Sequence, residues 1–247
     1  MLFRSVADCT AHPFECKFAG GKDLDILSAK APDSLESLYW RTKAGNELAT
    51  QAFFRLGQLP ESLELHQFRA DVARDSGHPR EAVEEWRAAL QLVPGDARAR
   101  QELAVSLFTA SDYRAAYDEA SALLKTKFSA ELAFVAGDSL LRLEDAAGAE
   151  QLLRAALKAD AHMVAAGASL GLALSRLERF KEAVPLLEKS LELDEDGSLH
   201  YQLARAYQAA GLADKARVTM GKYQELVERN QQAKDEVARE AQIGPPK

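Results

Sequence analysis

An alanine recurs at almost constant intervals through most of this chain. Its copies are Ala82, Ala116, Ala149, Ala183 and Ala216, so successive spacings are 34, 33, 34 and 33 residues. A second small residue precedes each alanine by twelve positions. The members of this second set are Ala70, Ala104, Gly137, Gly171 and Ala204. A fixed period of this length indicates stacked copies of one small structural unit. Small side chains at two fixed places let paired helices approach closely.

The best-patterned copy lies between residues 177 and 195. Phe180, Ala183, Leu187, Ser190 and Leu191 recur there at helical spacing, and charged residues occupy the other side. The same pattern upstream and downstream predicts five helix–turn–helix units. Their expected limits are about 63–96, 97–129, 130–163, 164–196 and 197–230. The fold class is therefore expected to be all-α, with 33–247 as one solenoid domain.

The segments on either side of the repeats have their own character. Residues 1–32 are punctuated by proline and glycine and are expected to be irregular. One long helix is predicted over 34–56, before the first unit. The last helix is expected to run on to about 241 with a polar surface, as a cap for the final apolar face of the stack.

The beginning of the chain has no apolar core of the length that a secretory signal needs. The first helix pair also lacks its upstream half. Because residues 1–5 also read like a translated sequencing adapter, we expect that the sequence is the C-terminal part of a longer protein. The compartment stays open between the cytoplasm and the periplasm or exterior.

Charge and hydropathy limit the partners. The net charge of −7 repels a polyanion on average, so no nucleic-acid partner is predicted. No apolar run approaches the ~20 residues that span a bilayer, so no membrane insertion is predicted. Cys9 and Cys16 are either two unrelated thiols or a small disulfide loop, and their spacing does not match CxxC zinc or redox sites. A metal would need two further ligands, and His12 is the only nearby candidate.

Catalytic signatures are not found. The five histidines are scattered, and no HExxH or GxSxG motif occurs. Paired carboxylates such as Glu84 and Glu85 fall on expected solvent faces. The sequence therefore predicts no enzyme activity and no cofactor.

The period, the alternating turns and the residue types at fixed places resemble tetratricopeptide repeats. The closest matches to the motif are Leu170, Gly171, Leu174, Phe180, Ala183, Leu187, Leu203, Ala204, Tyr207, Gly211 and Ala216. Residues 34–230 also resemble the C-terminal part of bacterial, acidobacterial-type proteins of this family. Arg69 and Pro79 depart from the motif in the first unit. The resemblance implies a right-handed superhelical solenoid.

The resemblance further implies that the first helix of each unit lines a concave groove that holds a partner peptide or protein. The expected partner-binding residues are Phe108, Phe134, Asp138, Leu141, Arg142, Leu172, Arg176, Tyr201 and Arg205. The apolar members form a patch, which the three arginines flank as possible partners for carboxylates. The alternative is that these side chains pack between adjacent first helices or under the last helix. Gln67, Asp71 and Glu102 stand where chaperone-binding relatives clamp a terminal carboxylate, so that role is not expected.

Two functions from different classes follow. The first is a non-catalytic protein–protein interaction scaffold. The alternative is the repeat region of a larger multidomain protein whose activity lies in a missing N-terminal part. Self-association through the helix at 34–56 is a weaker third hypothesis.

Overall fold

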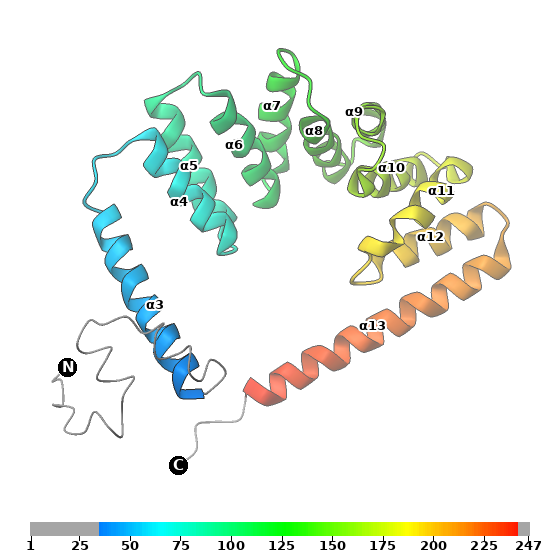
Figure 1. The fold of residues 1–247 in the computed structure, drawn as a ribbon. Coiled ribbons are helices and arrows are strands. Elements are labelled where there is room, and N and C mark those ends of the chain that lie inside the picture. The colour runs from blue at the N-terminus through cyan, green and yellow to red at the C-terminus, as the bar shows by residue number, and fades with distance from the viewer. Residues whose placement is uncertain (1–34, 242–247) are drawn as a thin grey trace. The chain divides into compact units, whose positions relative to one another are not determined.

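The computed structural model describes residues 35–241 (Figure 1). The chain divides into two compact units, Met1–Glu61 and Ser62–Lys247. In the first unit the described element is α3 (Leu35–Leu56), the long helix expected before the repeats. Several of its apolar side chains are exposed, among them Leu48 and Phe54. The segment 1–32, which the sequence predicts to be irregular and which contains Cys9, His12 and Cys16, lies outside the described residues.

The second unit consists of five helix pairs. They are α4 (Leu63–Asp75) with α5 (Pro79–Leu92), α6 (Ala97–Thr109) with α7 (Tyr113–Leu124), α8 (Ala130–Arg142) with α9 (Ala146–Ala159), α10 (Val164–Arg176) with α11 (Phe180–Ser190), and α12 (Ser198–Ala209) with α13 (Ala213–Ala241). A short 3-10 turn, η1 (Leu191–Leu193), follows α11, so this helix is shorter than the patterned stretch 177–195. No strand occurs in residues 35–241. The predicted all-α solenoid is confirmed.

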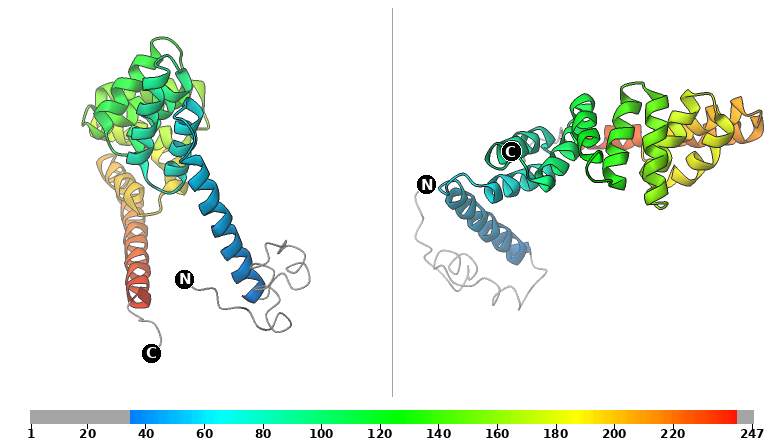
Figure 2. Two further views of the ribbon diagram at one scale, coloured as in Figure 1. Left: turned by 90° about the vertical axis from the view of Figure 1, so that its left-hand side faces the viewer. Right: turned by 90° about the horizontal axis from the view of Figure 1, so that it is seen from above.

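Within this second unit the pairs follow one another along an arc (Figures 1 and 2). Each helix packs against its partner, and each second helix packs against the first helix of the next pair. The first helices α8, α10 and α12 lie toward the inside of the arc (Figure 1). This arrangement places one face of these three first helices on the inner surface.

Short polar side chains set where the first helices begin. Ser62, Asp96 and Ser129 each accept a hydrogen bond from a backbone N–H in the first turn of α4, α6 and α8. Such N-caps satisfy donors that a helix start leaves without a partner. The start of α12 is capped by Asp194, whose carboxylate accepts hydrogen bonds from the backbone N–H groups of Leu199 and His200.

All five first helices end in the same turn. In each turn one residue has a left-handed backbone, and the next N–H bonds back to a carbonyl five residues earlier, as from His78 to Ala73. The left-handed residues and their φ angles are Gly77 (74°), Ser111 (65°), Glu144 (68°), Glu178 (60°) and Gly211 (80°). Glycine favours this conformation, and other residues are strained in it.

The small residues of the repeat lie where paired helices touch. All ten are buried, which confirms the close approach expected from the spacing. A Cβ atom added to Gly171 would lie 2.8 Å from Cγ of Leu187. The buried apolar residues form two clusters, one in the earlier and one in the later helix pairs. The core is continuous between them, because both clusters contact partly buried neighbours such as Tyr117, Leu124 and Phe134.

No helix between residues 35 and 241 is both long and apolar enough to cross a membrane. In the same range, no group of three His, Cys, Asp or Glu side chains is placed to hold a metal ion.

Candidate functional site

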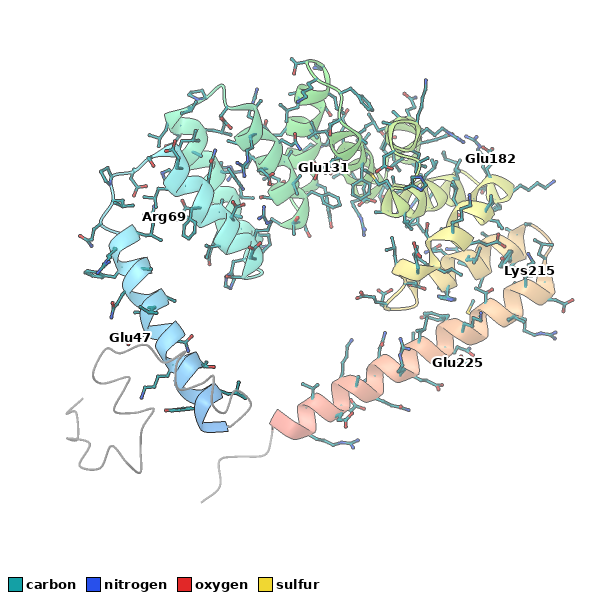
Figure 3. All side chains as sticks on the ribbon, in the orientation of Figure 1. Glu47, Arg69, Glu131, Glu182, Lys215 and Glu225 are labelled. Atoms are coloured by element: carbon teal, nitrogen blue, oxygen red, sulfur yellow. The ribbon has the colours of Figure 1, made fainter. Side chains whose placement is uncertain are left out.

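The candidate binding residues all lie on the first helices α6, α8, α10 and α12, whose side chains Figure 3 shows on the ribbon. Four of them are apolar and keep part of their surface in solvent. Phe108, Phe134 and Leu172 are half-buried, and Tyr201 is 38% exposed. We call these four residues the inner apolar row. Each of these side chains therefore packs on the stack and still presents a face to solvent, so neither the exposed patch nor full packing describes the row alone.

Aromatic rings join neighbouring units in this row. Phe108 meets Phe134 edge to face, with ring centroids 5.9 Å apart, and meets Tyr113 at the same distance. Tyr201 contacts Tyr223 of α13 at 5.4 Å. Edge-to-face pairs are stabilising beyond their burial. The packed rings are thereby held in fixed positions, which favours a surface that is formed before a partner arrives.

Leu141 does not belong to this surface. Its side chain is 2% exposed and packs in the core cluster with Leu140 and Leu174. The last turn of α8 is covered because α8 lies in the middle of the stack and packs against α7, α9 and α10. Our assignment of Leu141 to the groove is corrected for this reason.

Asp138 is also buried, but it is bonded on both oxygens. Ser169 Oγ of α10 donates to Oδ1 at 2.6 Å, and Arg142 Nε donates to Oδ2 at 3.2 Å. The Asp138 side chain is 3% exposed, whereas that of Arg142 is 53% exposed. A buried carboxylate needs such partners, since its desolvation is otherwise costly. The role of Ser169 could not be predicted from the sequence, because nothing in its local pattern marks it as the partner of a residue 31 positions earlier.

The other two candidate arginines are exposed. Arg176, the last residue of α10, donates from Nη1 to the carbonyl oxygen of Leu141 at 2.5 Å. Arg205 of α12 lies over the ring of Tyr201, with 5.9 Å between its guanidinium carbon and the ring centroid. Among the described residues neither arginine has a carboxylate within 4 Å.

On the first helix α4, by contrast, an arginine is surrounded by carboxylates. Arg74 pairs there with Asp71 at 2.9 Å, with Asp75 at 3.3 Å and with Glu102 at 3.5 Å. Burial raises the pKa of Glu102 above its ordinary value of 4.5, and nearby Glu131 and Asp71 add to this while Arg74 opposes it. The guanidinium of Arg74 on α4 is therefore paired with carboxylates, whereas Arg176 of α10 and Arg205 of α12 have no ion pair within residues 35–241.

The fold has relatives among known proteins. A family model described as "Tetratricopeptide repeat" matches residues 168–196, which span most of α10 and all of α11. MamA 41-end from Desulfovibrio magneticus RS-1 superposes with a TM-score of 0.58 over 70% of this chain and 98% of its own, at 21% identity.

The chain therefore contains a segment that matches a tetratricopeptide repeat, and its fold is that of the solved tetratricopeptide-repeat structures. A MamA RS-1 double mutant gives a TM-score of 0.59 at 22% identity, again over 70% of this chain and 98% of its own. YrrB, described as a tetratricopeptide-repeat protein with an unusual peptide-binding site, gives 0.52 at 19% identity over 64% of this chain and 82% of its own. At these identities the likeness to the solved tetratricopeptide-repeat structures shows the fold alone. No curated protein matches the chain.

Proposed function

We propose that this chain is a non-catalytic scaffold that binds a segment of a partner protein along the inner face of its first helices. The observation that carries the proposal is the inner apolar row. Phe108, Phe134, Leu172 and Tyr201 come from four successive units and stay partly exposed, whereas the other large apolar side chains on these helices are mostly buried. Apolar side chains gathered on one surface of this kind favour a binding site.

The fold supports the same proposal. Each unit adds one first helix to the inner face, so the surface is extended and suits an elongated ligand. YrrB, which has this fold, is described by its peptide-binding site. Fixed aromatic side chains with exposed faces are efficient anchors, because they bury much area and lose little freedom on binding.

The test uses a random-peptide library displayed on phage, selected against the whole chain. We expect enriched peptides that lose binding to a Phe134→Glu, Leu172→Glu double variant. Because Phe134 and Leu172 also pack on the core, a Tyr201→Ser, Arg205→Ser variant provides a second test at more exposed positions. Circular dichroism and thermal unfolding show whether each variant keeps its helices.

The matched control is Leu92→Glu, which places a charge at an exposed leucine of the second helix α5 (49% exposed). This control should bind like the original chain. Selected peptides that bind both inner-face variants normally, or a library that yields none, would contradict the proposal.

A further inference from the structure

The last turn of α8 brings two arginines of consecutive units together. Arg142 is the final residue of α8 and Arg176 the final residue of α10, the adjoining first helix. Arg142 is bonded to Asp138 in that turn, and Arg176 is bonded to the carbonyl oxygen of Leu141 in the same turn. Both guanidinium groups are thus anchored to residues near the C-terminal end of α8.

Each guanidinium keeps donors that nothing in the described chain uses. Arg142 is held through Nε alone, so Nη1 and Nη2 have no protein acceptor among residues 35–241. Arg176 is held through Nη1 alone, which leaves Nε and Nη2. Arginine binds carboxylates through a planar fork of donors, and a fork whose orientation is already fixed loses less entropy on binding.

Helix-end stabilisation accounts for only part of this arrangement. A base at a helix C-terminus interacts favourably with the helix dipole, which explains Arg142 and Arg176 as residue types. It does not explain a carboxylate buried beside Arg142, because a buried ion lowers stability unless its partners are well placed. Asp138 instead fixes the direction of Arg142 and is itself fixed by Ser169.

Two apolar side chains of the inner apolar row lie earlier on the same two helices. Phe134 is two helical turns before Arg142 on α8, and Leu172 is one turn before Arg176 on α10. Both are half-buried members of the inner apolar row. Glu144 and Asp145 follow α8 in the turn to α9. The carboxylate of Asp145 caps α9 by accepting from Gly148, and Glu144 has no ion pair with either arginine.

We infer that Arg142 and Arg176 form a carboxylate-binding subsite for an acidic partner segment. That segment places an apolar side chain on Phe134 and Leu172 and an aspartate or glutamate against the two guanidiniums, while Asp138 acts as a positioning residue. The inference rests on the proposed function and adds the chemistry of the partner. Charge complementarity selects it, since Arg142 and Arg176 each keep donors without an acceptor among residues 35–241, whereas Arg74 of α4 is paired with three carboxylates.

The test compares three sets of short synthetic peptides that share one apolar residue. Two glutamates follow this residue in the first set, two glutamines in the second and two lysines in the third. The original chain should bind the glutamate set about tenfold or more tightly than the glutamine set, because a charge-assisted pair is worth at least that factor. Added salt should reduce this preference.

Variants then locate the preference. Arg142→Ala with Arg176→Ala should bind glutamate and glutamine peptides equally, and Arg142→Glu with Arg176→Glu should prefer the lysine set. Asp138→Asn keeps an acceptor for Ser169 but weakens the hold on Arg142, so the glutamate preference should fall while helix content stays. Arg114→Ala removes the same charge from the second helix α7 and should change nothing.

Several outcomes overturn the inference. They are equal binding of the glutamate and glutamine sets by the original chain, a preference for lysine, or a glutamate preference that survives in the Arg142→Ala, Arg176→Ala variant. If phage-selected peptides still require Phe134 and Leu172, the proposed function stands and only the subsite is wrong. If neither experiment yields binding, both fall.

Discussion

Gly171 shows how strongly one residue constrains the stack. It lies on α10 where α11 crosses closely, and an added Cβ would fall 2.8 Å from both Cγ and Cδ2 of Leu187. Leu187 is fully buried, so it has no free space into which it can move. Gly137 meets Leu153 in the same way one unit earlier. The absence of a side chain at these positions is therefore required by packing and not by backbone conformation.

We predict that Gly171→Ala lowers the free energy of unfolding by about 1–3 kcal/mol, the usual cost of overpacking a core. Helix propensity alone would change it in the opposite direction, since alanine is favoured over glycine by about 1 kcal/mol. Gly221→Ala on α13 isolates that second effect, because nothing lies within 4 Å of its added Cβ. This control should raise stability by about 0.5–1 kcal/mol. Urea unfolding measures both, and a stabilising Gly171→Ala would contradict the close contact.

At the scale of the elements, α9 and α11 are joined by a ladder of charges on the outer side of the stack. Arg179 bonds Glu150 at 2.7 Å and Glu182 at 2.7 Å, and Arg154 bonds the same two carboxylates at 2.8 and 2.9 Å. Hydrogen bonds from these arginines hold the pKa of Glu150 and of Glu182 below the ordinary value of 4.5. Networks of this kind contribute more than isolated surface pairs.

Arg179→Ala should lower the thermal midpoint, and the difference from the original chain should shrink at high salt because these charges are largely exposed. The pH dependence follows from the lowered pKa values of the two glutamates. The two glutamates stabilise the fold above pH 4.5, and this stabilisation is lost as the pH falls through their lowered pKa values. The difference in thermal midpoint between Arg179→Ala and the original chain should therefore also vanish in acid. Thermal scans at several pH values measure it. Arg217→Ala, which breaks a fully exposed pair with Asp214, is the control and should have little effect at any pH.

The sequence predicted the elements better than it predicted the site. The ten small residues and the helix pairs could be found because their period repeats five times in register. The burial of Leu141 and Asp138 could not be predicted, because each position on α8 can face either the inner surface or the next first helix. Which of the two occurs depends on the contact between α8 and α10, and that contact involves Ser169 and Arg176 from the following unit. A pattern within one unit does not contain this information.

For the second unit as a whole, α13 has two parts with different roles. Its first part packs on α12, and Asn230 makes the last bond back to the stack, from Nδ2 to the carbonyl oxygen of Glu195 at 2.8 Å. The side chains of residues 231–239 are all exposed. In a stack where each element contacts only its neighbours, stability is a sum of local contributions. The end of α13 therefore contributes little to the rest.

A stop after Asn230 should leave the free energy of unfolding of the repeats within about 0.5 kcal/mol of the original, as for other exposed changes. A stop after Gly221 removes Tyr223 and Leu226, which pack on Gly197 and Tyr201. That second truncation should cost more than about 2 kcal/mol, in the range of large core deletions. Denaturant unfolding followed by circular dichroism compares the two. Equal losses would show that the distal part of α13 is bound to the stack.

The five equal turns at the ends of the first helices have a consequence for how this protein responds to heat and to change. Two of them use glycine, whereas Ser111, Glu144 and Glu178 hold a left-handed backbone with a side chain in place. Each of the three carries conformational strain on the order of 1 kcal/mol that glycine would relieve. None belongs to the proposed binding surface. Replacing these three residues with glycine should therefore raise the thermal stability of the scaffold and leave the proposed binding surface unchanged.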